Sequence, residues 1–272
     1  MNRPGDSGGI IAGFFAFTEI TEPSAHKAYN EWHQFDHLPE QLPIAGIASG
    51  QRWVASPRCG ALTYSSGEGL ERQADLSVAQ YLTLYLMRGP LDETLRCFYD
   101  LAAQLHTEDR FFPHRRALES GPLGVRALFA APRVRVSPPA VPYRPNRGVY
   151  LVVSRSLSDE PESHTGVDSH LADELLGIDG VAGVWFFGPG PDSQEENVAQ
   201  GRSVAAPPGS GSAFRADVTL CFLDEDPVSV ASDIAGLLRP RWEREGAMPR
   251  LAGPFETVVP WSWDWFDDSA ST

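Results

Sequence analysis

The chain has 272 residues, of which 42% are hydrophobic, and its 22 basic and 36 acidic residues give a net charge of −14 at pH 7. This hydrophobic share allows a sizeable core and disfavours global disorder. The negative charge repels nucleic-acid phosphates and anionic lipid, and no basic patch with interleaved aromatics occurs, so no nucleic-acid partner is expected.

The sequence also lacks signs of a membrane or secreted protein. No apolar run approaches the ~20 residues that span a bilayer, and residues 1–9 lack the pattern of a secretion signal. The three cysteines are far apart and form no CxxC motif, which is typical of reduced thiols. We therefore expect a cytoplasmic protein without a membrane partner.

The first half of the chain predicts a β-α-β-β-α-β order. Thr21 to Ser24 supplies helix-start chemistry, and Pro39 is expected to end or kink the helix that follows. Strands in this order around two helices indicate the ferredoxin-like arrangement. The predicted strands are at about 10–18, 46–56, 79–87 and 123–136, and the helices at about 24–37 and 92–106.

The order then repeats after a proline-rich linker. We predict a first unit at 1–136, the linker at 137–147, and a second unit at 148–272 that ends in a tryptophan-rich tail. The second unit's strands are expected at about 148–157, 180–187, 214–223 and 252–259, and its helices at about 162–176 and 226–244. Long loops are expected at 57–77 and 188–212 in corresponding places.

Short matches between the halves indicate a tandem repeat. His37-Leu-Pro-Glu-Gln-Leu42 matches His170-Leu-Ala-Asp-Glu-Leu175, and Ile44-Ala-Gly-Ile-Ala-Ser49 matches Ile178-Asp-Gly-Val-Ala-Gly183. Two divergent copies of one unit explain these matches better than chance.

The first unit resembles a known family. Trp32 with His37-Leu-Pro39, the Ile44 to Ile47 strand entry and Arg52-Trp53 resemble the EthD-like branch of the dimeric α/β-barrel superfamily. The resemblance implies an α+β fold in which the two ferredoxin-like units of one chain form an intramolecular barrel. It also implies that the histidine of the H-x-P motif borders a ligand cleft. The second unit departs from the motif, because Ala172 replaces the proline and Phe186-Phe187 replace Arg52-Trp53.

A helical wheel divides the residues of the first helix into two faces. An apolar stripe is expected to pack on the sheet, whereas His26, His33 and Glu40 lie on another face and are expected at the surface. His37 differs from these residues, because Pro39 is expected to disrupt the backbone beside it and to turn its ring towards the space between helix and sheet. The stripe consists of Ala25, Ala28, Trp32, Phe35 and Leu42.

The leading hypothesis is a cofactor-independent acid/base enzyme acting on a small apolar, aromatic or polyketide-like compound, such as a cyclase, a dehydratase or a related lyase or isomerase. A histidine can transfer protons near neutral pH, and a carboxylate can fix its tautomer. His37 is the predicted acid or base, and Asp36 or Glu40 its orienting partner. The predicted substrate contacts are Tyr29, Arg52, Trp53 and Tyr85, and some members of the superfamily, such as olivetolic acid cyclase, resemble such a scheme.

Other interpretations remain open. The chain could be a non-catalytic small-molecule-binding or structural barrel, or a monooxygenase-like enzyme. His33 and His37 have the spacing of two metal ligands, but no third ligand with motif spacing appears, and no haem-attachment motif occurs, so no metal or cofactor is expected. No glycine-rich phosphate loop, G-x-S-x-G or H-E-x-x-H motif is present. Trp261, Trp263 and Trp265 alternate and are expected to share a face in an extended tail, covering the open end of the barrel or a sheet edge, or forming a homodimer contact.

Overall fold

Strands from both halves of the chain form one closed sheet in the computed structural model, which describes residues 8–66, 74–155, 168–189, 212–214 and 216–267. The order around the sheet is β1-β3-β2-β9-β5-β8-β6-β4, and pairing of β4 with β1 closes the barrel, while β7 pairs with β4 in parallel. The strands are β1 (Ile10–Ile20), β2 (Ile47–Val54), β3 (Tyr81–Arg88), β4 (Arg115–Ala130), β5 (Gly148–Ser154), β6 (Val181–Gly188), β7 (Ser212–Ala213), β8 (Asp217–Leu223) and β9 (Leu251–Thr257).

Each half therefore contributes four strands with the order of a ferredoxin-like sheet, β4-β1-β3-β2 in the first and β9-β5-β8-β6 in the second. The halves are joined by β2 with β9 and by β4 with β6. This is the predicted α+β fold, an intramolecular barrel of the dimeric α/β-barrel type.

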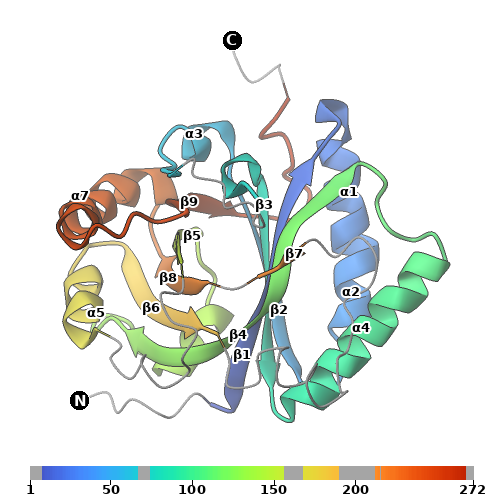
Figure 1. Cartoon of the computed structure of the whole chain (residues 1–272), viewed down its shortest axis with the longest axis horizontal. Coiled ribbons are helices and arrows are strands. Elements are labelled where there is room, and N and C mark those ends of the chain that lie inside the picture. Colours follow the sequence, from blue (N-terminus) through green and yellow to red (C-terminus); the bar gives the residue numbers. More distant parts are fainter. Residues whose placement is uncertain (1–7, 67–73, 156–167, 190–211, 215, 268–272) are drawn as a thin grey trace.

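Helices cover the outside of the barrel on two sides (Figure 1). α1, α2 and α4 of the first half lie on one side, and α5 and α7 of the second half lie on the other, next to the short α3 of the first half. The helical segments are η1 (Pro23–Ala25), α1 (His26–Trp32), η2 (His33–His37), α2 (Leu38–Gln41), α3 (Pro57–Gly60), η3 (Leu76–Val78), α4 (Leu91–Thr107), η4 (Pro138–Tyr143), α5 (Ser169–Leu176) and α7 (Pro227–Glu245).

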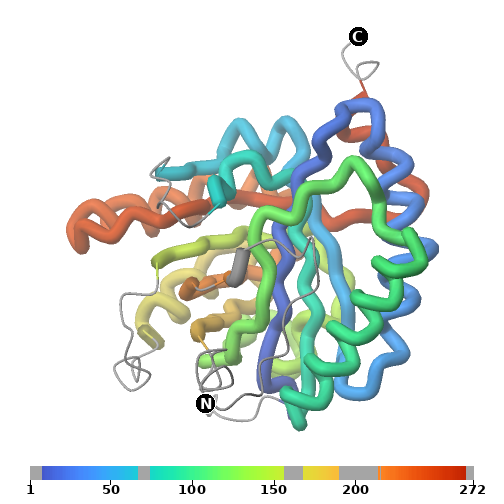
Figure 2. Tube along the Cα trace, turned by 45° about the vertical axis from the view of Figure 1, so that its right-hand side comes forward, coloured from blue at the N-terminus to red at the C-terminus, as the bar shows by residue number. Residues whose placement is uncertain are grey.

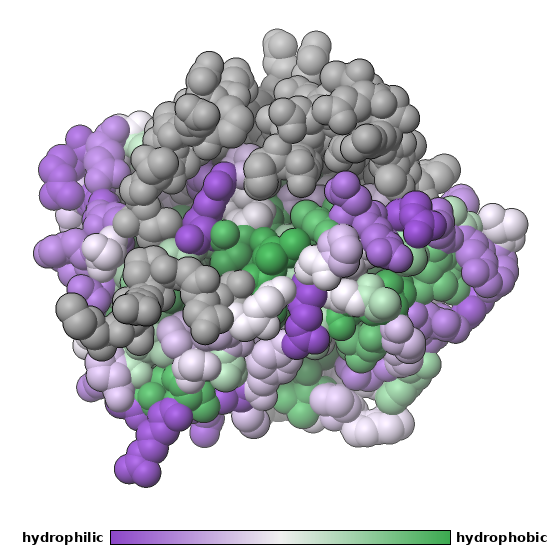
Figure 3. All heavy atoms as spheres, turned by 90° about the horizontal axis from the view of Figure 1, so that it is seen from below, coloured by the Kyte–Doolittle hydropathy of each residue, from purple (hydrophilic) through white to green (hydrophobic). Residues whose placement is uncertain are grey.

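The inside of the barrel is packed with apolar side chains. Alternate residues of a strand point to opposite faces, so Phe15 and Phe17 enter the barrel core while Phe14 and Ala16 face the helices. Trp53 and Trp185 are fully buried in the same core. On the face seen from below, apolar residues gather near the middle and hydrophilic residues lie at the sides (Figure 3). Apolar side chains fill the interior of the barrel, in contrast to the helix-facing side of the first-half sheet, which also carries polar residues.

Two glycines support the repeat relationship between the halves. Gly46 and Gly180 have φ values of +95° and +92°, which strongly favour glycine. A Cβ at Gly46 would meet Thr94 Oγ1 at 2.0 Å, and one at Gly180 would meet Val230 Cγ2 at 2.7 Å. Thr94 is the fourth residue of α4, and Val230 is the fourth residue of α7. The glycine turn before the second strand of each half therefore packs against the same position of the helix that follows.

The structure differs from the expected elements in a few places. β4 begins at Arg115 rather than near 123, because Arg115 to Pro122 already pair with β1. It ends at Ala130, before Pro132, rather than near 136. The second helix of the second half is confirmed, with the Asp226 carboxylate accepting from the Val228 N–H at 3.0 Å as an N-cap. The expected loop at 188–212 and the start of the 162–176 helix lie largely outside the described residues.

The C-terminal tail is not the extended segment that was expected, and it packs against the first half of the chain. Trp261 has a φ of +72° and is 77% exposed, whereas Trp263 is buried. The tail runs beside α1 (Figures 1 and 2), where Phe266 stacks on His26 with ring centroids 3.9 Å apart. It also contacts η2, where the ring centroids of Phe35 and Trp261 are 4.7 Å apart. A segment of the second half thus covers a helix of the first.

Candidate active site between the first helix and the sheet

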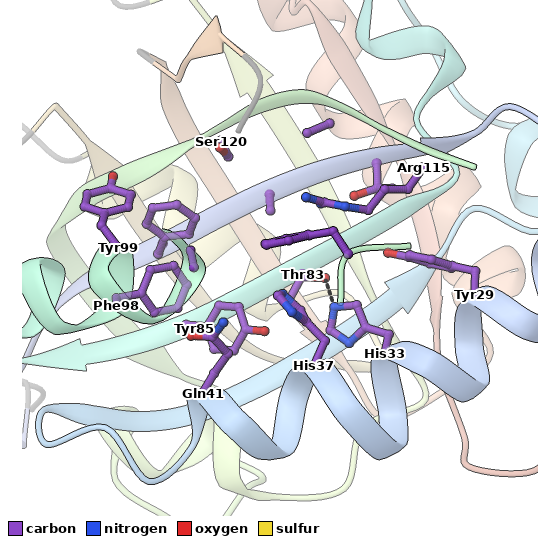
Figure 4. Close-up of a pocket in the computed structure, with 16 residues that line it drawn as sticks. Tyr29, His33, His37, Gln41, Thr83, Tyr85, Phe98, Tyr99, Arg115 and Ser120 are labelled. Carbon is purple, nitrogen blue, oxygen red and sulfur yellow. Dashed lines mark hydrogen bonds between the residues drawn. The ribbon is translucent and has the colours of Figure 1, made fainter. Parts of the chain in front are cut away.

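A cavity of about 70 Å³, partly open to solvent, lies between the outer face of the first-half sheet and the helices that cover it. His33, His37 and Gln41 point into it from one helix, Phe98 and Tyr99 close its other end from α4, and Arg115 extends over it from β4 (Figure 4). The full lining is Phe14, Ala16, Thr18, Tyr29, His33, His37, Gln41, Thr83, Tyr85, Phe98, Tyr99, Ala102, Phe111, Arg115, Ala117 and Ser120.

The helix that carries the histidines continues through Pro39, contrary to expectation. A π turn at His33–His37 precedes the proline, with the Leu38 N–H donating to the His33 carbonyl. A π turn leaves one helical carbonyl without a donor, which matches the N–H that Pro39 lacks. The wide turn therefore allows α2 to follow in the same direction and brings Gln41 to the cavity.

The predicted orientation of this helix was wrong. Phe35 and Leu42 are 49% and 43% exposed, whereas His26 and His33 are buried. The face that points to the sheet is polar and aromatic. The C-terminal tail covers part of the apolar face, since Phe35 packs against Trp261 and Trp263.

The corresponding helix face in the second half is filled by apolar side chains. The side chains that pack together between α5, α7 and the sheet include Leu175, Val181, Val230, Ile234 and Trp242. His170, the repeat counterpart of His37, has a side chain that is 79% exposed and lies 3.4 Å from Glu174. Where the first half places polar side chains over its sheet, the described part of the second half places apolar ones.

His37 and His33 are neighbouring, neutral imidazoles. Their ring centroids are 5.1 Å apart, and His37 also stacks on Trp32 at 4.6 Å with planes at 21°. Burial, together with the charges of Arg115, Arg52 and Arg110, lowers the pKa of His37 to about 3, and burial and Arg52 lower the pKa of His33 well below its usual value. Neither ring nitrogen of His37 has a hydrogen-bond partner among the described residues.

Two arginines bring positive charge to this site. Arg52 is 4% exposed, its Nη2 donates to Asn30 Oδ1 at 3.0 Å, and its Cζ lies 5.2 Å from the centre of the Tyr29 ring. The Cζ of Arg115 lies 4.7 Å from the centre of the Phe111 ring, and burial lowers the pKa of Arg115. Within the part of the chain that the structure describes, neither arginine forms an ion pair with a carboxylate.

Unpaired buried polar atoms concentrate here. Within the described residues these include His33 Nδ1, Gln41 Oε1, Tyr85 Oη, and Nε and Nη1 of Arg52. Leaving such an atom buried without a partner costs roughly 1–3 kcal/mol, so native proteins rarely keep several together without a reason. Burial raises the pKa of Tyr85, so its phenol stays protonated and can donate a hydrogen bond.

The residues predicted for the site are separated by the fold. His37, Tyr29 and Tyr85 line the cavity, and Arg52 lies behind Tyr29. Trp53 points to the opposite side of β2, where its Nε1 donates to Asn146 Oδ1 at 3.0 Å inside the barrel.

The two predicted carboxylate partners of His37 are engaged elsewhere. Arg110 Nη2 lies 2.9 Å from Asp36 Oδ1 and 2.8 Å from Glu40 Oε1, at the outside of the helix. Neither carboxylate forms a hydrogen bond with His37 among the described residues. In this arrangement the orienting neighbour of His37 is Trp32.

Sequence reasoning missed His33, Gln41, Thr83 and Arg115 as lining residues. Thr83 Oγ1 lies 3.5 Å from His33 Nε2, a contact between strand and helix that no spacing motif encodes. Arg115 fell outside the predicted strand. The available signal was the helical spacing of Tyr29, His33 and His37 on one face.

Three further features of the described residues concern metal binding, membrane spans and the cysteines. They contain no group of three or more His, Cys, Asp or Glu placed to hold a metal ion. No helix among them has the length and apolar character needed to cross a bilayer. Cys59 and Cys221 are buried, and burial raises the pKa of each thiol, to about 11 and about 12.

The chain matches no family model and no curated protein. Among solved structures, an anthrone oxidase-like protein is similar over 94% of this chain and 95% of its own, with 9% identity and a TM-score of 0.45. A monooxygenase candidate from Fusobacterium nucleatum is similar over 92% and 94%, with 5% identity and a TM-score of 0.47. A chlorite dismutase from Candidatus Nitrospira defluvii is similar over 96% and 94%, with 12% identity and a TM-score of 0.46. One fold can carry many chemistries, and the reaction depends on the residues of the site.

Proposed function

We propose that the chain is a cofactor-independent enzyme that moves a proton on a small organic substrate held in this cavity, with His37 as the acid/base group. The observation that supports this proposal is the position of the His37 ring in the cavity, where neither ring nitrogen has a hydrogen-bond partner among the described residues. A neutral imidazole accepts a proton at one nitrogen and can donate one from the other.

The proposed step is removal of a proton from a carbon next to a carbonyl. The C–H bond breaks, its proton passes to His37, and its electron pair moves to the carbonyl oxygen as an enolate. Tyr85 Oη and the guanidinium of Arg115 can donate to that oxygen, and a buried site strengthens such bonds. Return of the proton at another carbon would complete an isomerisation. In a cyclisation the enolate carbon would instead attack a second carbonyl of the substrate, whose oxygen takes the proton, and in an elimination the enolate would expel a β-substituent that leaves with the proton.

The low pKa of His37 sets a condition on this proposal. A base works best when its pKa lies near the working pH, and a pKa of about 3 makes His37 a weak base unless a neighbouring charge changes. A negative charge near Arg115 and Arg52 would offset their effect and raise the pKa of His37. Substrate binding would then activate the base.

Proton exchange into solvent tests the proposal without knowing the physiological substrate. Aryl ketones and aryl 3-oxo acids are incubated with the protein in D₂O, and loss of the α-proton signal is followed by NMR. His37→Gln should abolish the catalysed exchange, whereas His170→Gln, at the exposed counterpart, should leave it unchanged. Equal exchange by His37→Gln and the unaltered protein would refute the role of His37.

The remaining alternatives are separated by further measurements. Substrate-dependent oxygen consumption in the same panel would favour the monooxygenase-like alternative. Binding without exchange or oxygen consumption would favour a binding protein. Membership of the EthD-like branch and a homodimer formed through the C-terminal tail also remain proposals, and sedimentation analysis tests the homodimer.

A further inference from the structure

The cavity has a polar end and an aromatic end. Tyr29, His33 and Arg115 lie together at one end, and Phe98 and Tyr99 lie at the other (Figure 4). The volume of about 70 Å³ is less than half the ~150 Å³ that accommodates benzene in an engineered protein cavity. The enclosed space therefore suits the head of a ligand, and a larger body must extend past the aromatic residues or displace them.

The polar end carries unbalanced positive charge. Arg115 lines the cavity, and Arg52 adds a second cation behind Tyr29. Aromatic rings pack on both guanidinium groups, but no described carboxylate pairs with either one. Arg52 is buried, whereas Arg115 is half-buried. Removing a cation from water without an anion is costly, and this cost falls when a ligand supplies the missing charge.

We propose that the ligand of this cavity is a small carboxylic acid with an aromatic or other apolar body, its carboxylate against Arg115 and its body towards Phe98 and Tyr99. The planar guanidinium of arginine matches a carboxylate with two parallel hydrogen bonds. The aromatic end offers apolar contacts and rings that can stack on the body of the ligand. This inference deepens the proposed function, because it names the substrate class for the same cavity.

Binding of benzoate to the full chain tests the inference, with benzamide as a neutral probe of nearly the same shape and acetate as a probe without the body. Titration calorimetry should show that benzoate binds at least about tenfold more tightly than benzamide and than acetate. Arg115→Gln should remove the preference for benzoate over benzamide, and Arg115→Lys should keep part of it. Arg116→Gln is the matched control, because Arg116 is exposed and pairs with Glu19.

Several outcomes would overturn the inference. The first is equal affinity for benzamide and benzoate, and the second is a dissociation constant for benzoate above about 10 mM. The third is an unchanged preference for benzoate over benzamide in a folded Arg115→Gln protein. Circular dichroism establishes whether that variant folds, and the comparison of probes on the unaltered protein decides the question if it does not. Benzoate binding that persists in His37→Gln while proton exchange is lost would support both proposals. Benzoate binding without any exchange would support the substrate class alone.

Discussion

The imidazole of His37 lies nearly flat against the indole of Trp32, with ring centroids 4.6 Å apart. The indole is itself held, because Trp32 Nε1 donates to the Arg110 carbonyl at 2.7 Å. An aromatic surface therefore orients the histidine, whereas the nearby carboxylates pair with the Arg110 side chain.

This arrangement predicts which neighbours of His37 affect proton exchange. Asp36→Asn and Glu40→Gln should each leave the exchange rate within about twofold and cost no more than about 1 kcal/mol of stability, as is usual for surface ion pairs. Trp32→Ala should slow exchange by about tenfold or more, because His37 loses its stacking partner. NMR exchange rates of the three variants provide the measurement, and a large loss in Asp36→Asn would restore the carboxylate as the orienting group.

A second prediction concerns the charge next to His37. After burial, Arg115 is the largest cause of its lowered pKa, which is about 3. Arg115→Gln should therefore raise the pKa of His37 by about one unit. Histidine-selective NMR titration measures the shift, and Arg116→Gln should leave the value unchanged. An unaltered pKa in Arg115→Gln would show that the guanidinium does not act on His37.

Stability should fall as the solution becomes acidic, in part because of His26. Burial lowers its pKa to about 4 in the folded chain, while the unfolded value is 6.5. Between these values the unfolded state binds the proton more readily, so stability is full above pH 6.5 and is lost as the pH falls towards 4. At pH 5, His26 alone should cost about 2 kcal/mol of unfolding free energy, at ~1.4 kcal/mol per pKa unit.

Urea unfolding at pH 7 and pH 5 tests this contribution. His26→Phe keeps a ring against Phe266 and removes the titrating group, so the loss between the two pH values should be smaller in this variant. His170→Phe is the control at an exposed position and should keep the full loss. An identical pH dependence in His26→Phe would exclude the contribution.

The paired glycines predict a symmetric effect on stability. Gly46→Ala and Gly180→Ala should each destabilise the chain by roughly 2 kcal/mol or more, because both need positive φ and a Cβ would collide with α4 or α7. Gly236→Ala is the matched control in the exposed face of α7, where nothing lies within 4 Å of the added atom. Thermal unfolding should show a gain of up to about 1 kcal/mol there.

Substitutions of Trp261 and Trp263 in the tail should have very different effects on stability, although the two residues are only two positions apart. Trp263 is 7% exposed and packs with Tyr29 and Val54, so Trp263→Ala should cost about 3–5 kcal/mol. Trp261→Ser should cost less than about 1 kcal/mol, because its side chain is 77% exposed. Denaturant unfolding compares the two, and similar losses would indicate that the tail packs differently.

The sequence determined the architecture because strand and helix order depend on local signals. Apolar runs, the Asp226-Pro227 helix start and the matched stretches around Gly46 and Gly180 predicted two units of four strands each. Periodicity and turn chemistry act over short distances and remain readable in one dimension. The same signals singled out His37, although its role stays a prediction.

Only the tertiary structure decided which side of the first helix faces the sheet. An apolar stripe normally turns to the core, but here the C-terminal tail, more than 200 residues away, covers part of it, and the polar face turns inward. The π turn, the contact of Thr83 with His33, and the approach of Arg115 from β4 likewise depend on segments brought together by folding. The type of each residue is local information, but its neighbours across the cavity are set by long-range packing.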